Sequence, residues 1–181
     1  MNINIKENII KSQELLKNKK FDDAEFILLK NLEINDKSFE TLFLLGAICG
    51  IKKQFSKAEK YFKNALLINP KHINLIVNLA IILKKLNKRN ESIDYFNKAV
   101  HLDKNNVESY CALGQIYEEE KDFKKAEIYF KKGLEIKPND HVSNHAYGKL
   151  LLKLDQHFNG LKLIEKVSGI IRFKKNIVQI I

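Results

Sequence analysis

The sequence has few of the residues that build β-rich, disulfide-bonded or membrane-spanning proteins. It holds no tryptophan, two prolines, seven glycines and two cysteines among 181 residues. So few prolines and glycines disfavour a β-sandwich or a β-barrel, which need many tight turns, and favour helices. Cys49 and Cys111 are isolated in the sequence, which predicts reduced thiols of a cytoplasmic protein and not a disulfide framework.

Long apolar segments are also missing. The longest nearly apolar run, Leu42 to Ile51, is much shorter than the roughly 20 residues that span a bilayer. Residues 1–7 lack the basic start and the apolar core of a secretory signal. With 45% apolar residues, the chain can bury a substantial core. We therefore expect a soluble, cytoplasmic protein that does not contact a membrane.

The net charge of +10 raises the question of nucleic-acid binding. The basic surface is interrupted, because residues 107–140 carry six basic and eight acidic side chains. Arg89 and Arg172 are the only arginines in the sequence, whereas recognition of phosphates and bases favours arginine. We expect a solvated, lysine-rich exterior and no specific nucleic-acid partner.

Small residues recur every 34 positions. One series is Ala24, Ala58, Ser92, Ala126 and Gly160, and a second is Ser12, Gly46, Ala80, Gly114 and Gly148. A period of 34 residues indicates an array of helix–turn–helix repeats. Glycine inside a helix costs about 1 kcal/mol relative to alanine, so its use here predicts close helix crossings within each repeat. The predicted facing pairs are Gly46 with Ala58, Ala80 with Ser92, Gly114 with Ala126, and Gly148 with Gly160.

Residues 39–72 illustrate the repeat. Apolar residues at three- and four-residue steps predict a helix over 39–52, a turn at Lys53 and Gln54, and a second helix over 55–68. Pro70 ends that helix, because the residue before a proline is disfavoured in the α region. The same pattern divides the chain into repeats at 5–38, 39–72, 73–106, 107–140 and 141–174, of which the first and last are degenerate. Residues 168–181 are expected to be a cap or a tail, either a capping helix or a strand that pairs outside the array.

These repeats resemble the tetratricopeptide repeat (TPR) family. The family pattern appears as Leu42, Leu45, Gly46, Cys49, Phe55, Ala58, Phe62, Ala65 and Pro70, and again as Tyr110, Leu113, Gly114, Tyr117, Phe123, Ala126, Phe130, Gly133 and Pro138. Leu42, Ile76 and Tyr110 stand where the family usually has a tryptophan. The resemblance implies an all-α, right-handed solenoid of about five helix–turn–helix repeats in a single array over residues 1–181.

The resemblance also implies a scaffold that holds a peptide or a helix of a partner protein on the concave face formed by the first helix of each repeat. The predicted contact residues are Phe43, Ala47, Ile51, Val77, Asn78, Ile81, Cys111, Gln115, His145 and Lys149. The alternative for Phe43 and Ile81 is packing beneath neighbouring helices. One subset of the family grips a terminal carboxylate, but only Asn78 fits that subset here, so such a ligand is not expected.

Catalytic and metal sites are not expected. His141 and His145 have the spacing of two metal ligands on one helix face, yet no zinc-protease glutamate and no third ligand accompany them. We therefore expect no enzyme, no catalytic residue, no metal and no cofactor. Two alternatives stay open. One is an accessory or substrate-docking module of an enzyme of the oxygenase, sulfotransferase or glycosyltransferase type, and the other is a structural protein that self-associates weakly through the ends of the array.

Overall fold

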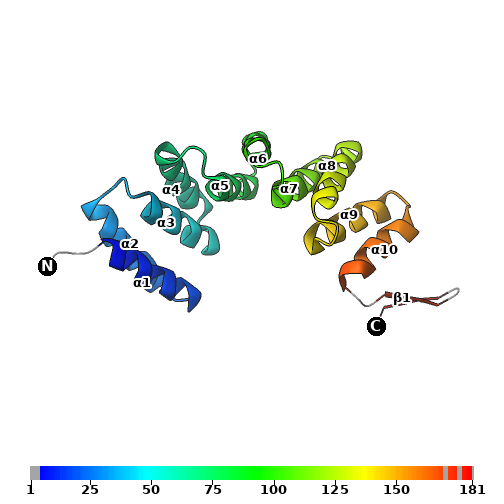
Figure 1. The fold of residues 1–181 in the computed structure, drawn as a ribbon, viewed down its shortest axis with the longest axis horizontal. Helices are drawn as coiled ribbons and strands as arrows, with labels where there is room; N and C mark the ends of the chain where they lie inside the picture. The colour runs from blue at the N-terminus through cyan, green and yellow to red at the C-terminus, as the bar shows by residue number, and fades with distance from the viewer. Residues whose placement is uncertain (1–4, 169–170, 175–176, 181) are drawn as a thin grey trace. The chain divides into compact units, whose positions relative to one another are not determined.

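The computed structural model describes residues 5–168, 171–174 and 177–180, which form ten α-helices and one two-stranded hairpin (Figure 1). The helices are α1 (Ile5–Lys17), α2 (Phe21–Ile34), α3 (Phe39–Ile51), α4 (Phe55–Ile68), α5 (Ile73–Lys85), α6 (Arg89–Leu102), α7 (Val107–Glu119), α8 (Phe123–Ile136), α9 (His141–Lys153) and α10 (His157–Ser168). The strands are β1 (Ile171–Lys174) and β2 (Ile177–Ile180). The predicted all-α solenoid of helix–turn–helix repeats is confirmed.

The chain divides into two compact bodies, residues 1–98 and residues 99–181, called the N-terminal and the C-terminal body below. In the N-terminal body each helix from α1 to α5 packs against the next, and α3 also contacts α5. In the C-terminal body the helices from α7 to α10 pack in the same order, and α7 also contacts α9. Within each body, consecutive repeats therefore pack against one another, as expected of a stacked array.

In two repeats a glycine of the first helix receives a phenylalanine ring of the second. A Cβ atom on Gly46 would lie 2.4 Å from Phe62 Cε1, and one on Gly114 would lie 2.7 Å from Phe130 Cδ1. Both rings are buried, so a larger residue at either glycine would clash within a close-packed core. The close crossings predicted at these glycines are present, but the nearest side chain is the ring and not the predicted alanine.

The other two predicted crossings bring the facing residues together directly. The Ser92 hydroxyl donates a hydrogen bond of 2.8 Å to the carbonyl oxygen of Ala80. A Cβ atom on Gly148 would lie 2.8 Å from the carbonyl oxygen of Gly160. The facing pairs predicted at these positions are therefore confirmed.

A capping side chain precedes each first helix from α3 to α9. Ser38, His72, Asn106 and Asp140 each accept a hydrogen bond from the backbone N–H three residues later. They stand 34 residues apart, and a cap of this kind is worth about 1 kcal/mol. The sequence period is therefore also a period of helix starts.

The turn inside each repeat has one residue in the left-handed region. Lys19, Lys53, Asn87, Lys121 and Asp155 have φ between 58° and 61°. At the second turn, Lys53 N–H bonds to the Gly50 carbonyl at 3.1 Å and Gln54 N–H to the Cys49 carbonyl at 2.8 Å. These two bonds form a Schellman motif, which satisfies the last carbonyls of the first helix.

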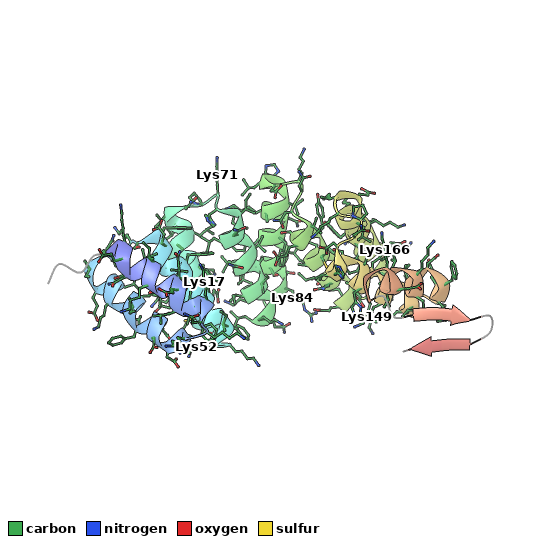
Figure 2. The ribbon with its side chains drawn as sticks, turned by 60° about the horizontal axis from the view of Figure 1, so that its bottom comes forward. Lys17, Lys52, Lys71, Lys84, Lys149 and Lys166 are labelled. Atoms are coloured by element: carbon green, nitrogen blue, oxygen red, sulfur yellow. The ribbon has the colours of Figure 1, made fainter. Side chains whose placement is uncertain are left out.

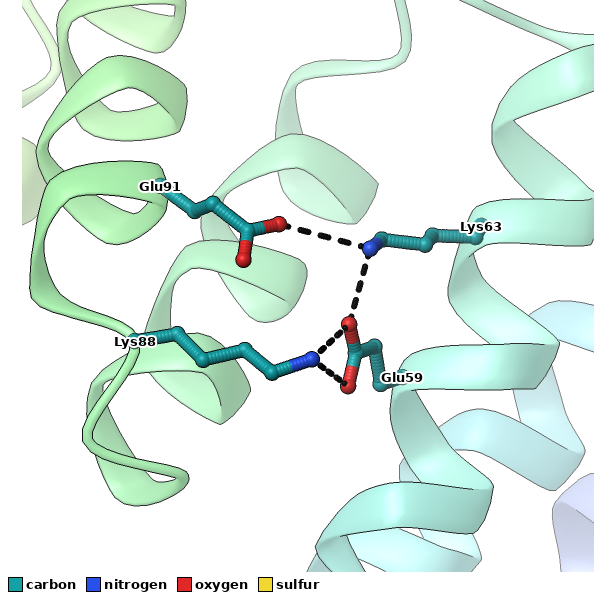
Figure 3. Close-up of polar contacts among 4 residues, drawn as sticks. All are labelled: Glu59, Lys63, Lys88 and Glu91. Atoms are coloured by element: carbon teal, nitrogen blue, oxygen red, sulfur yellow. Dashed lines mark hydrogen bonds and ion pairs between the residues drawn. The ribbon is translucent and has the colours of Figure 1, made fainter.

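Carboxylates on second helices link consecutive repeats. Glu59 on α4 accepts hydrogen bonds of 2.8 and 2.9 Å from Lys88, which follows α5, and lies 2.8 Å from Lys63 Nζ (Figure 3). Burial acts to raise the pKa of Glu59, but the hydrogen bonds from Lys63 and Lys88 outweigh it and hold the pKa below its ordinary value. Two further carboxylates act similarly, Glu25 with Lys52 and Glu127 with Tyr147.

The C-terminal tail pairs with itself in the described residues. β1 and β2 are antiparallel, with Ile171 opposite Ile180 and Lys174 opposite Ile177. A strand was one of the two forms expected for this tail, and its partner is the chain's own second strand. Residues 169–170, 175–176 and 181 of the tail, and residues 1–4 at the other end, lie outside the described residues.

Ala126→Leu is expected to destabilise the C-terminal body. Ala126 is 0% exposed and shares a core cluster with Phe130 and Tyr147. Extra side-chain volume in such a site costs roughly 1–3 kcal/mol. Urea unfolding followed by circular dichroism measures the change, with the half-exposed Ile128→Leu on the same helix as the matched control. An unchanged midpoint for Ala126→Leu contradicts the packing described above.

Glu59→Gln is expected to lower the free energy of unfolding by about 1–2 kcal/mol at neutral pH, because two lysines lose a charged hydrogen-bond partner. The folded-state pKa of Glu59 is lowered, so its stabilisation is complete above the ordinary value of 4.5 and disappears as the pH falls through the folded-state value.

Unfolding of wild type and Glu59→Gln between pH 7 and pH 3 measures this difference. Glu91→Gln is the control, because Glu91 lies 3.4 Å from Lys63 Nζ and both side chains are exposed, a pair worth little. Equal effects of the two substitutions at neutral pH contradict a specific role of Glu59.

Candidate functional site

A groove lies between the first helices α3 and α5 of the N-terminal body and is called the N-terminal slot below. Its volume is about 330 Å³, and it is lined by Ala47, Gly50, Ile51, Phe55, Phe62, Asn78, Ile81, Ile82 and Lys85. The four lining residues of α5 lie on one stripe of that helix, because residues three, four and seven positions apart share a face. The repeat pattern thus places one wall of the slot.

The lining of the N-terminal slot is mostly apolar and partly open to solvent. Phe62 and Ile82 are 2% and 5% exposed and belong to the core beneath, whereas Ile51 is 57% exposed at the rim. Gly50 adds no side chain, and a Cβ atom there would come near only Ile82 Cδ1, at 3.3 Å. Apolar surface of this kind gains free energy when another apolar surface covers it.

Two polar side chains interrupt the apolar lining. Asn78 is half-buried, and Lys85 at the end of α5 is exposed. Lys85 is the one charged residue that lines the slot, and no carboxylate among the described residues of the N-terminal body pairs with it. Other lysines stand at the C-terminal ends of the first helices in this body, namely Lys17, Lys52 and Lys84 (Figure 2).

A second groove lies between α7 and α9 of the C-terminal body and is called the C-terminal slot below. Its volume is about 560 Å³, and it is lined by Gln115, Glu118, Glu119, His141, Val142, His145, Ala146, Lys149 and Lys153. Seven of its nine lining residues are of polar or charged types. Lys153 on α9 forms an ion pair with Glu118 on α7, whose side chain is 14% exposed. The pair connects the two walls of the slot.

The two slots occupy equivalent positions of the repeat. Residues 47, 50, 51, 78, 81 and 85 of the first correspond, 68 positions later, to Gln115, Glu118, Glu119, Ala146, Lys149 and Lys153 of the second. The repeated backbone therefore forms one kind of groove twice. The side chains make the first apolar and the second charged.

Seven of the ten predicted contact residues line a slot. Ala47, Ile51, Asn78 and Ile81 line the N-terminal slot, and Gln115, His145 and Lys149 line the C-terminal slot. Val77 and Cys111 are 3% and 4% exposed, so their burial leaves them little surface for a partner. The half-buried Phe43 packs against the rings of Phe39, Phe62 and His72.

The predicted set omits residues that shape the slots. Phe55 and Phe62 come from the second helix of a repeat, so a map of first helices alone does not find them. The ion pair between Glu118 and Lys153 is also absent from that set. A signal for it exists in the sequence, because opposite charges stand at positions of consecutive first helices that border one groove.

The paired histidines of α9 are not brought to a third ligand. His141 and His145 line the C-terminal slot, but no group of three or more histidine, cysteine, aspartate or glutamate side chains with metal-site geometry occurs in the part of the chain that the structure describes. Among those same residues, no helix has the length and apolar character to cross a membrane.

Similar solved structures share the fold at low sequence identity. They include MamA from Desulfovibrio magneticus RS-1 (18% identity, TM-score 0.80, covering 91% of this chain and 93% of that one). PilF of Pseudomonas aeruginosa is 18% identical with a TM-score of 0.80, covering 91% of this chain and 75% of that one. YrrB, described as a TPR protein with an unusual peptide-binding site, is 20% identical with a TM-score of 0.71, covering 90% and 84%. No curated protein of similar sequence was found.

A sequence model of the tetratricopeptide repeat matches residues 39–72, 73–106 and 107–140. The matched residues make up more than half of the chain, and they contain the glycine–phenylalanine crossings at Gly46 and Gly114. The resemblance seen in the sequence is therefore confirmed, and the chain belongs to the tetratricopeptide repeat family.

Proposed function

We propose that this chain is a non-catalytic scaffold whose two slots bind segments of a partner protein. TPR proteins are in general protein-interaction scaffolds, and the similar protein YrrB carries a peptide-binding site by its description. The observation that carries the proposal is the N-terminal slot, an apolar groove with Ile51 57% exposed at its rim. A partner that covers this surface gains roughly 25 cal/mol for each Å² of apolar area buried.

In this proposal the two slots contact different parts of the partner. Ala47, Ile51, Asn78 and Ile81 take apolar side chains, and Gln115, His145 and Lys149 take polar ones. Phe43, Val77 and Cys111 act as support beneath the contact surface. A cytoplasmic location suits the two buried free cysteines, because thiols stay reduced there.

The double variant Ile51→Glu/Ile81→Glu is expected to lose the partner. Both carboxylates lose their hydration when an apolar surface of the partner covers them, which weakens binding by at least about tenfold. Affinity purification of the full chain with quantitative mass spectrometry measures recovery of each co-purifying protein.

Leu67→Glu is the matched control, because Leu67 on α4 is 85% exposed and lines neither slot. Circular dichroism establishes that all variants fold. A protein that is recovered equally with wild type and with the double variant does not bind through the slot. If every co-purifying protein is recovered equally, the proposal is wrong.

A further inference from the structure

The C-terminal slot shows how a cation at the end of a slot is neutralised. Lys153 stands near the end of α9, and Glu118 on the facing wall supplies its carboxylate. The Glu118 side chain is 14% exposed and the Lys153 side chain 56% exposed, so the pair lies partly within the groove. The chain thus provides both charges of this ion pair itself.

The N-terminal slot has the same cation without the carboxylate. Lys85 corresponds to Lys153, and the residue that corresponds to Glu118 is Gly50. Neither α3 after Glu40 nor any part of α5 contains an acidic residue. A Cβ atom at position 50 would meet one close neighbour, the terminal Cδ1 atom of Ile82 at 3.3 Å, which must shift slightly to admit it.

We propose that a partner segment supplies the missing carboxylate. The segment places an aspartate or glutamate side chain over Gly50 and against Lys85, and its neighbouring apolar side chains rest on Ile51 and Ile81. This inference rests on the proposed function and adds the chemistry of the partner, an apolar stretch with one acidic residue. The one charged residue in the lining, Lys85, is positive, so an acidic segment is complementary and a basic one is repelled.

The carboxylate comes from a side chain and not from a chain end. Glu118 is itself a side chain on a continuous helix, and it meets one lysine. A chain end bound through its carboxylate usually meets several donors, whereas the N-terminal slot offers Lys85 and the half-buried Asn78. A single cation suits one acidic side chain within a longer apolar segment.

The test begins with a phage library of short random peptides held between constant flanks, so that no peptide has a free end. Selection on the full wild-type chain is expected to enrich aspartate or glutamate beside apolar residues. Selection on Lys85→Glu is expected to enrich lysine or arginine at the same place. Lys60→Glu makes the same change of net charge on an exposed position of α4 outside the slots, and its selected peptides should match those of wild type.

A selected peptide, acetylated and amidated, then serves as the probe in calorimetry. Replacing its acidic residue by the amide is expected to weaken binding to wild type about two- to fivefold, as for a partly exposed ion pair. The same replacement should have no effect with Lys85→Met. Gly50→Glu is expected to weaken binding of the acidic peptide by a similar factor, because the substitution places a carboxylate at the position that Glu118 has in the other slot.

The outcomes separate this inference from the proposed function. Suppose that selected peptides bind wild type but not Ile51→Glu/Ile81→Glu. If these peptides show no preference for acidic residues, or if selection on Lys85→Glu gives the same acidic preference, the carboxylate inference alone is overturned. If no peptide is enriched on wild type over Ile51→Glu/Ile81→Glu, the slot does not bind segments and both proposals fail. If the sedimentation coefficient depends on protein concentration for wild type but not for Gly50→Glu, a second copy of the chain is the occupant of the slot. That result also overturns the carboxylate inference.

Discussion

The structure depends on the phenylalanine that the second helix of a repeat packs against a glycine of the first. Gly46 leaves room for the Phe62 ring, which brings α3 and α4 close together. The same ring belongs to the core that α5 completes through Leu75 and Leu79. One side chain therefore sets both the crossing within a repeat and the approach of the next. Phe62 also lies beneath the N-terminal slot, so the groove is a consequence of this packing.

The same contact between a glycine and a phenylalanine occurs again at Gly114 and Phe130. It therefore does not depend on the surface around it. The Phe130 ring stacks on Tyr147 of the next repeat, with centroids 6.0 Å apart. The ends of the first helices are as regular as these crossings. Five turns share one backbone conformation, with lysine, asparagine or aspartate at the left-handed position. A non-glycine residue there costs about 1 kcal/mol, which the Schellman hydrogen bonds and the packed helices offset. With crossings and ends fixed, exposed positions are free to differ.

The period and the helix boundaries could be read from the sequence because they depend on contacts within one repeat. Helices predicted over 39–52 and 55–68 are found at Phe39–Ile51 and Phe55–Ile68. Which residues of a helix face stay open could not be read in the same way. Val77 and Ile81 are one turn apart, yet Val77 is 3% exposed and Ile81 lines the slot. The difference arises from side chains of neighbouring helices, which the spacing within one helix does not contain.

The partners of polar residues were hard to predict for a related reason. Glu118 and Lys153 are 35 residues apart and meet because two first helices border one groove. When the residues of the two slots are matched by the repeat period, Gly50 is found at the position of Glu118, and the missing carboxylate can be recognised. An exposed lysine such as Lys85 keeps its water, so the array loses little stability when its carboxylate is absent.

An exposed ion pair is worth only about 0.2–1 kcal/mol, which limits what a carboxylate at Lys85 contributes to affinity. Most of the binding free energy must then come from apolar area at Ile51 and Ile81, with the charge setting direction and rejecting basic segments. The exchange of Glu118 for Gly50 between two copies of the same groove removes the internal carboxylate partner of the lysine. The repeat architecture thus keeps one kind of groove in both bodies, while the side chains that line it differ.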